Sequence, residues 1–150
     1  MIKSDIVGVI ITPQKIVSVG GGNVLHAMKR DDPGYTSFGE AYFSIVESQA
    51  IKAWKRHRKM TLNLVVPVGL IRFIIVDDRN GKAAKPHYQE VILSKDNYNR
   101  LSVPPMVWVG FQGLSKGNAM LLNIASIPHD PDESDRKDIN EIEFDWSIKK

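Results

Sequence analysis

Residues 51–64 read IKAWKRHRKMTLNL, a run of apolar and basic residues without a glycine or proline. Read as one regular strand, its side chains alternate between two faces. One face carries Lys55, His57, Lys59, Thr61 and Asn63, and the other carries Trp54, Arg56, Arg58, Met60, Leu62, Leu64 and Val66. The first face is a polar row suited to line a cavity, whereas the second becomes apolar, as in a strand packed against another sheet. A solvated edge strand protected by its charges is the competing interpretation.

Strand patterns also fill the chain on both sides of this stretch. Short apolar runs separated by turn residues occur at 7–12, 15–19, 41–46, 51–55, 61–68, 70–76, 88–93, 101–103, 106–111 and 119–126. Pro13-Gln14 predicts a hairpin between the first two runs, and residues 26–39 predict a loop. Short helices are expected only at 95–100 and 132–136. Many short strands with regular turns predict an all-β domain, closed or made of two sheets, with residues 1–150 as a single unit.

Composition and hydropathy restrict the class of protein. With 43% hydrophobic and 25% charged residues among 150, the chain has the balance of a globular domain. The longest apolar run, residues 64–71, contains Pro67 and Gly69 and is too short to cross a bilayer. At the N-terminus Asp5 precedes any hydrophobic stretch, so no signal peptide is expected. We therefore expect a cytoplasmic protein without a membrane partner.

The chain has no cysteine, which excludes disulfides, thiolate nucleophiles and cysteine-based metal sites. Its net charge is only +3, but residues 52–59 hold six basic or histidine side chains in eight positions, and residues 130–145 are acidic. A local basic patch suits a phosphate or another anion. Nucleic-acid binding would need a stronger overall charge and interleaved exposed aromatic residues, so no nucleic-acid partner is expected.

Several motifs occur in an order that resembles the dTDP-4-dehydrorhamnose 3,5-epimerases. They lie at 34–40, 51–57, 76–79, 93–94, 97–98, 101–105, 110–111, 114–115 and 129–131, and the resemblance spans residues 22–147. It implies a cupin-type jelly roll (a double-stranded β-helix) that forms a homodimer and acts on a nucleotide-linked 4-keto-6-deoxy sugar. A related branch, the dTDP-sugar 3,4-ketoisomerases, has an Arg-Gly-Phe-His-Ala-His-Lys-Lys strand that residues 52–59 resemble almost as well.

The resemblance also implies a site, in which this chain departs from the family. The family's arginine and its histidine base correspond to Lys52 and Lys55, and its tyrosine acid corresponds to Asn123. His57 corresponds to the second histidine of the ketoisomerase strand. The aspartate that orients the family's base belongs to a C-terminal extension that this chain is expected to lack.

Epimerisation next to a ketone needs a base, stabilisation of the enolate oxygen and an acid on the opposite face. His57 has the ordinary pKa of such a base, although it could instead hydrogen-bond a backbone carbonyl. Lys55 would serve as a base only with a pKa lowered to about 7–8; protonated, the role we favour, it stabilises an enolate or holds a phosphate. Asn123 can donate to an oxyanion but cannot relay a proton. Tyr42 is the candidate substitute acid, or else a core residue of its strand.

Five further residues are candidates for substrate binding, namely Lys52, Phe38, Glu40, Asn63 and Trp108. Phe38 and Glu40 follow the loop with which family members hold the nucleotide and sugar, and a solvated loop is the alternative. Asn63 belongs to the polar row. Trp108 has the ring to stack on a base or sugar, or it fills the core.

No metal or other cofactor is expected. Metal-binding cupins have a His-x-His strand, a following Glu and a later His, and the corresponding positions here are Lys55, His57, Leu62 and Val109. One ligand of four does not hold a divalent ion against water.

The sequence is compatible with three functions: a sugar-nucleotide epimerase, which we place first, a 3,4-ketoisomerase, and a jelly-roll protein that binds the nucleotide sugar without catalysis.

Residues 62–68 and 70–76 are apolar on both faces, which is more apolar surface than a single sandwich of 150 residues needs. Together with the resemblance, they predict a homodimer that buries about 1,600 Å² or more.

Overall fold

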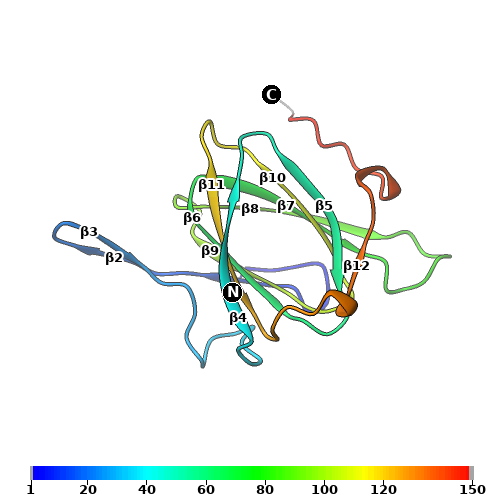
Figure 1. The fold of residues 1–150 in the computed structure, drawn as a ribbon, viewed down its shortest axis with the longest axis horizontal. Coiled ribbons are helices and arrows are strands. Elements are labelled where there is room, and N and C mark those ends of the chain that lie inside the picture. The colour runs from blue at the N-terminus through cyan, green and yellow to red at the C-terminus, as the bar shows by residue number, and fades with distance from the viewer. Residues whose placement is uncertain (1, 149–150) are drawn as a thin grey trace.

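The computed structural model describes residues 2–148, which form two antiparallel five-stranded sheets facing each other (Figure 1). The first sheet has the order β1 (Ile10–Pro13), β9 (Asn99–Val103), β6 (Leu62–Val68), β11 (Ala119–Ala125) and β4 (Glu40–Val46). The second has the order β12 (Ser134–Arg136), β5 (Ile51–His57), β10 (Trp108–Gly113), β7 (Leu70–Asp77) and β8 (His87–Ser94). The predicted all-β cupin-type jelly roll is confirmed.

Four short elements lie outside the two sheets. Strands β2 (Ile16–Val19) and β3 (Gly22–Leu25) pair only with each other and project from the body of the domain (Figure 1). Two 3₁₀ helices, η1 (Pro131–Glu133) and η2 (Ile139–Glu141), flank the last strand and the segment that follows it.

The hydrophobic core fills one part of the space between the sheets. Ile71, Phe73 and Ile75 of β7 point into it and are fully buried, together with Leu93 and Leu101. Their large aliphatic and aromatic side chains leave no room for a ligand there, because protein interiors are closely packed.

The outer face of the second sheet is covered by the chain's own C-terminal segment. The segment after β12 runs along the outside of β5 (Figure 1). Phe144 and Trp146 of this segment pack with Trp54, Ile74 and Val76. The apolar residues on both faces of β7 therefore have partners within one chain. For this strand, two apolar faces do not require a second subunit, and the homodimer stays a prediction.

Three predicted local structures differ from the observed ones. Residues 7–19 do not form a hairpin at Pro13-Gln14: β1 pairs with β9, because Ile11 belongs to the core, and β2 turns back into β3 at Gly20-Gly21. Residues 95–100 form a turn and the start of β9 rather than a helix. Residues 132–136 form the end of η1 and then β12, whose pairing with β5 outweighs the local helix preference.

Residues 51–64 are two strands in different sheets, not one. Strand β5 ends at His57, and the chain crosses to the first sheet, where β6 begins at Leu62. The alternation of faces therefore restarts, so Leu62 and Leu64 face the interior while Asn63 faces outward. Asn63 is nevertheless buried, and its amide donates to the Gly34 carbonyl and accepts from the Ser102 hydroxyl.

A β-bulge changes the alternation within β5 as well. Lys52 lies opposite Phe111 and Lys55 opposite Val109, so two residues of β5 face the single Gly110 of β10. A Cβ on Gly110 would approach the Ala53 Cβ to 2.8 Å, so this position has no room for a side chain. Because the bulge adds one residue to the strand, Lys52 and Lys55 both reach the interior although they are three positions apart.

Candidate functional site

A cavity of about 650 Å³ occupies the part of the interior that the core does not fill. It lies toward the edge strands β4 and β12, and its walls are formed by both sheets and by residues 136–141. The lining residues are Tyr42, Ser44, Lys52, Ala53, Trp54, Lys55, His57, Leu62, Leu64, Val109, Phe111, Leu121, Asn123, Arg136, Lys137, Asp138 and Glu141. Its volume falls in the range of pockets that bind small molecules.

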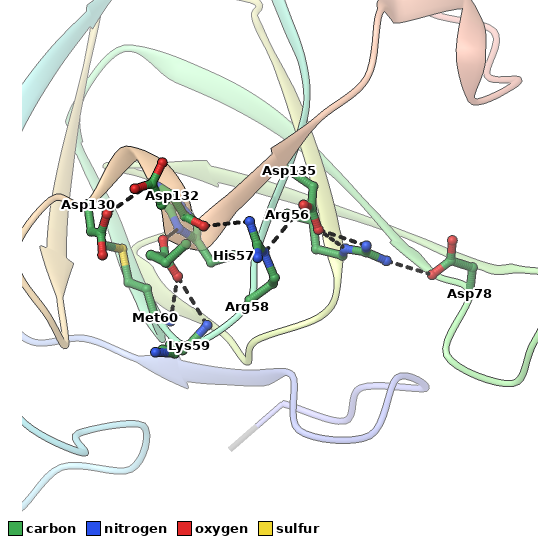
Figure 2. A network of polar contacts seen from close by, with 10 residues as sticks. Arg56, His57, Arg58, Lys59, Met60, Asp78, Asp130, Asp132 and Asp135 are labelled. Atoms are coloured by element: carbon green, nitrogen blue, oxygen red, sulfur yellow. Dashed lines mark hydrogen bonds and ion pairs between the residues drawn. The ribbon is translucent and has the colours of Figure 1, made fainter.

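His57, the last residue of β5, forms a buried pair with Glu133 of η1. The imidazole Nδ1 contacts one carboxylate oxygen of Glu133, and both side chains are almost completely buried. The other carboxylate oxygen accepts hydrogen bonds from the backbone amides of Lys59 and Met60, at 3.1 and 3.2 Å. Asp130 caps η1 by accepting from the Asp132 amide, which fixes the turn that carries Glu133 (Figure 2).

The two partners differ in charge near neutral pH. Burial lowers the pKa of His57, and this outweighs the opposing effect of the Glu133 carboxylate. Burial alone would raise the pKa of Glu133, but hydrogen bonds from His57 and from the two amides lower it overall. Glu133 is therefore ionised and His57 neutral, with Nδ1–H donating to the carboxylate. This tautomer leaves the lone pair on Nε2, the arrangement of a positioned general base.

Lys55 lines the same cavity two residues before His57. Burial lowers its pKa, and the charge of Arg136, its partner in the β5–β12 pairing, lowers it further. The carboxylates of Glu133 and Glu40 act in the opposite direction. Lys52 adds another cation to the cavity wall, whereas the ammonium group of Lys137 lies over the Trp108 ring on the outer face. Such a concentration of positive charge attracts an anionic ligand.

Tyr42 and Asn123 stand on the opposite wall, in the first sheet. They are directly paired across β4 and β11, and the Asn123 amide donates to the Tyr42 hydroxyl at 2.8 Å. Asn123 is only 4% exposed, whereas Tyr42 is 42% exposed at the edge strand. The cavity thus has a histidine–carboxylate pair on one side and a phenol held by an amide on the other.

The structure brings five of the nine predicted site residues together. His57, Lys55, Lys52, Tyr42 and Asn123 all line the cavity. Glu40 does not line it, but its charge acts on Lys55. As predicted, Arg56 and Arg58 are absent from the cavity wall and pair instead with Asp135 (Figure 2).

Three predicted residues lie elsewhere. Asn63 faces outward because β5 and β6 are separate strands. Trp108 belongs to the aromatic cluster on the outer face, where Arg56 and Lys137 lie over its ring and its indole N–H donates to Asp78 at 3.2 Å. Phe38 is 62% exposed and borders a separate hollow on the outside of the first sheet.

Sequence reasoning missed Glu133: it expected the family's aspartate to be lacking and named no other carboxylate as a partner of His57. The only signal was its place in an acidic segment, after an Asp-Pro pair typical of a turn. Within residues 2–148 no group of three or more histidine and acidic side chains is placed to hold a metal ion. In the same part of the chain, no helix has the length and hydropathy to cross a membrane.

Neither a protein-family model nor a curated protein matches the chain, but solved structures do. A dTDP sugar isomerase from Desulfovibrio desulfuricans G20 shares 38% identity over 93% of this chain and 90% of its own, with a TM-score of 0.86. A dTDP-4-dehydrorhamnose 3,5-epimerase from Bacillus anthracis, with TDP and PPi bound, shares 20% identity over 99% and 90%, with a TM-score of 0.83. A sugar 3,4-ketoisomerase from Thermoanaerobacterium thermosaccharolyticum, in complex with TDP, shares 17% over 87% and 89%, with a TM-score of 0.72. The last two similarities are likenesses of fold.

Proposed function

Because the chain belongs to the dTDP-4-dehydrorhamnose 3,5-epimerase family of cupin-type proteins, we propose that it is an epimerase of a dTDP-linked 4-keto-6-deoxy sugar. The observation that carries this proposal is the buried His57–Glu133 pair in the wall of a 650 Å³ cavity. A carbon-bound proton next to a ketone is acidic enough for such a base to remove it without a cofactor.

The reaction begins when Nε2 of His57 takes the proton from the carbon next to the ketone. The electron pair of the broken C–H bond moves to the carbonyl and forms an enolate. The ammonium group of Lys55 stabilises the enolate oxygen, and the Glu133 carboxylate stabilises the imidazolium. Tyr42 then returns a proton to the carbon, and the two side chains recover their starting states by exchange with water.

The placement of base and acid in opposite sheets favours epimerisation. His57 comes from the second sheet and Tyr42 from the first, so a sugar bound between them loses a proton on one face and gains one on the other. Lys52 and Arg136, together with Lys55, give the cavity the positive charge that a nucleoside diphosphate requires.

A 3,4-ketoisomerase is the second candidate. It is favoured by His57, which stands where the ketoisomerase strand has its second histidine, since a single base can remove a proton from one carbon and return it to the neighbouring one. In that reaction Tyr42 would stabilise charge rather than donate the final proton.

The test is incubation of the protein with dTDP-4-keto-6-deoxyglucose in heavy water. Deuterium at carbons next to the ketone, with a retained 4-ketone and altered configuration, supports an epimerase. A product with the ketone moved to C3 identifies a ketoisomerase. Binding of the nucleotide sugar with neither deuterium incorporation nor a new product would contradict both and leave a non-catalytic binding protein.

We further propose that the protein is a homodimer joined through the outer face of the first sheet. Phe43, Ile45 and Val68 lie on this face and are each at least half exposed. Ile45 and Val68 flank Met120 in one row across three strands, so their exposed side chains are contiguous. Light scattering at micromolar concentration should give twice the chain mass for the wild type and a monomer for Ile45→Glu. A monomeric wild type would contradict this proposal.

A further inference from the structure

The side-chain amide of Asn123 has a hydrogen-bond partner for its nitrogen but none for its oxygen among the described residues. Its Nδ2 donates to Tyr42, but its Oδ1 has no hydrogen-bond partner among residues 2–148, although the residue is only 4% exposed. Buried polar groups in native proteins nearly always have a partner, and leaving one unpaired is costly. The unpaired oxygen belongs to a residue that lines the cavity, so a bound ligand can supply the missing donor.

Two neighbours of Asn123 on the same wall are aliphatic, and the hydroxyls of Tyr42 and Ser44 on this wall do not bond to its Oδ1. Leu64 of β6 is paired directly with Asn123, and Leu121 lies two residues before Asn123 on the same face of β11. Both leucines line the cavity. An amide oxygen accepts hydrogen bonds and cannot donate one, so its partner must carry an O–H or N–H group. The carbons of a sugar ring that do not react carry such groups as hydroxyls.

The same amide also determines where the phenol of Tyr42 points its proton. A phenolic oxygen both accepts and donates hydrogen bonds. Because the Asn123 N–H₂ group already donates to this oxygen, the Tyr42 O–H hydrogen must be directed to another acceptor. The amide therefore leaves the phenol free to donate into the cavity.

We propose that Asn123 recognises a ring hydroxyl of the bound sugar through Oδ1 and positions Tyr42 as a proton donor through Nδ2. This inference rests on the proposed function, because it takes the ligand to be a nucleotide-linked sugar. It makes Asn123 a specificity-determining and positioning residue: the site selects a sugar that carries a hydroxyl next to the reacting part of the ring over one that lacks it.

The binding experiment uses ligands that cannot react. Isothermal titration calorimetry compares dTDP-6-deoxyglucose, which has no ketone, with its counterparts that lack the 2- or the 3-hydroxyl. We expect the wild type to bind one of the deoxygenated ligands about 5- to 100-fold more weakly, the range for leaving a buried acceptor unpaired. Asn123→Leu should bind all three ligands alike, with its affinity for dTDP unchanged.

The outcomes separate this inference from the function beneath it. Equal affinity of the wild type for all three ligands, with deuterium exchange intact, would overturn the role of Asn123 alone, as would discrimination that persists in Asn123→Leu. Failure to bind any dTDP-sugar would overturn the proposed function and this inference with it. The comparison of ligands on the wild type needs no variant, so it stands even if Asn123→Leu does not fold.

Asn123→Asp tests the second half of the proposal. A carboxylate still accepts from a sugar hydroxyl, but it also accepts the Tyr42 O–H hydrogen and turns it away from the cavity. We expect this variant to keep the discrimination between ligands while exchange falls by at least tenfold, within the range for a positioned acid. Unchanged exchange, or loss of discrimination, in a folded Asn123→Asp protein would contradict the two roles.

Asn99→Leu is the matched control. Asn99 is a buried asparagine of β9, 6% exposed, whose amide bonds to Asn97 outside the cavity. The same substitution there should lower the thermal unfolding temperature without changing discrimination or exchange. If it removed discrimination as Asn123→Leu does, the effect at Asn123 would be a general loss of stability and the proposal would fail.

Discussion

Strands β5 and β7 flank β10 in the same sheet, yet the space beneath them differs completely. The inward side chains of β7 are Ile71, Phe73 and Ile75, all fully buried in the core. Those of β5 include Lys55 and His57, which line the cavity. Charged and titratable groups are costly to bury without a partner, so they leave the interior open to a ligand where apolar side chains would close it. Two strands of one sheet, separated only by β10, thus border the site and the core respectively.

The outward faces of the two strands, by contrast, are alike. Trp54 of β5 and Ile74 of β7 both lie beneath the C-terminal segment. Arg72 holds this segment by donating to the Trp146 carbonyl at 2.7 Å, and Trp54 donates to the Ile139 carbonyl at 3.2 Å. The C-terminal segment therefore packs against both strands. The polar side chains of β5 project from an element held in this way, as a precise site requires.

The largest effect on deuterium exchange is expected at His57, because β5 carries the proposed base and the side chains that β7 directs into the core are apolar. His57→Ala should lower the rate of deuterium exchange about 10²- to 10⁴-fold, because it removes the base and leaves the fold in place. The measurement is exchange into dTDP-4-keto-6-deoxyglucose, with circular dichroism as the check on folding. Arg56→Ala, on the outward face, is the control and should change exchange by much less. The reverse result in two folded proteins would refute the assignment of faces on β5.

Phe73→Ala tests the core beneath β7, the counterpart of the site beneath β5. It should lower the free energy of unfolding by about 3–5 kcal/mol, because it leaves a cavity in the core. Urea denaturation measures this loss, and Val7→Ala, at a position 80% exposed, should leave the unfolding free energy nearly unchanged. Exchange per folded molecule should stay close to that of the wild type. A small loss of stability would show that the core is not concentrated beneath β7.

Lys55 should act through its charge. Lys55→Ala should lower exchange about 10²- to 10³-fold, as the loss of a group that stabilises an oxyanion does. Lys55→Arg keeps the charge but cannot lose a proton in this range, so it should retain a substantial part of the activity. Affinity for dTDP, measured in parallel, shows whether either variant disturbs binding. Complete loss of exchange in Lys55→Arg with dTDP affinity intact would instead indicate that Lys55 is a base.

The smallest expected effect is in the pH profile. Because burial lowers the pKa of His57, the acidic limb of kcat/KM for exchange should be centred below pH 6.5. Glu133 raises the pKa of His57, so Glu133→Gln should move this acidic limb to lower pH still. An acidic limb centred above pH 6.5, or a shift to higher pH in Glu133→Gln, would contradict the assigned tautomer.

The same lowered pKa makes a contribution to stability with a defined sign. The unfolded chain takes up a proton on His57 near pH 6.5, whereas the folded chain does so only at lower pH. The contribution is therefore fully present above pH 6.5 and is lost as the pH falls through the folded pKa. Denaturation of the wild type and of His57→Ala between pH 7.5 and pH 5 should show the smaller acid sensitivity in the variant.

Much of the fold follows from local sequence. Alternating or continuous apolar runs identify β4 to β11, because burial of one or both faces of a strand requires them. The hairpin at residues 16–25 and the turn at residues 95–98 were not predicted, since the partner of a strand depends on which faces must reach the core. Local propensity does not contain that information.

The site divides in the same way. The basic strand alone identified Lys55 and His57, because charged and titratable side chains alternating along a strand indicate a polar cavity wall. The bulge opposite Gly110 and the crossing from β5 to β6 could not be read from it, and they decided that Lys52 faces the cavity while Asn63 does not. The pairing of His57 with Glu133, and of Tyr42 with Asn123, joins residues more than 70 positions apart. The sequence therefore determined which chemical groups the chain carries, and only the tertiary structure decided their partners, because a hydrogen bond depends on distance in space.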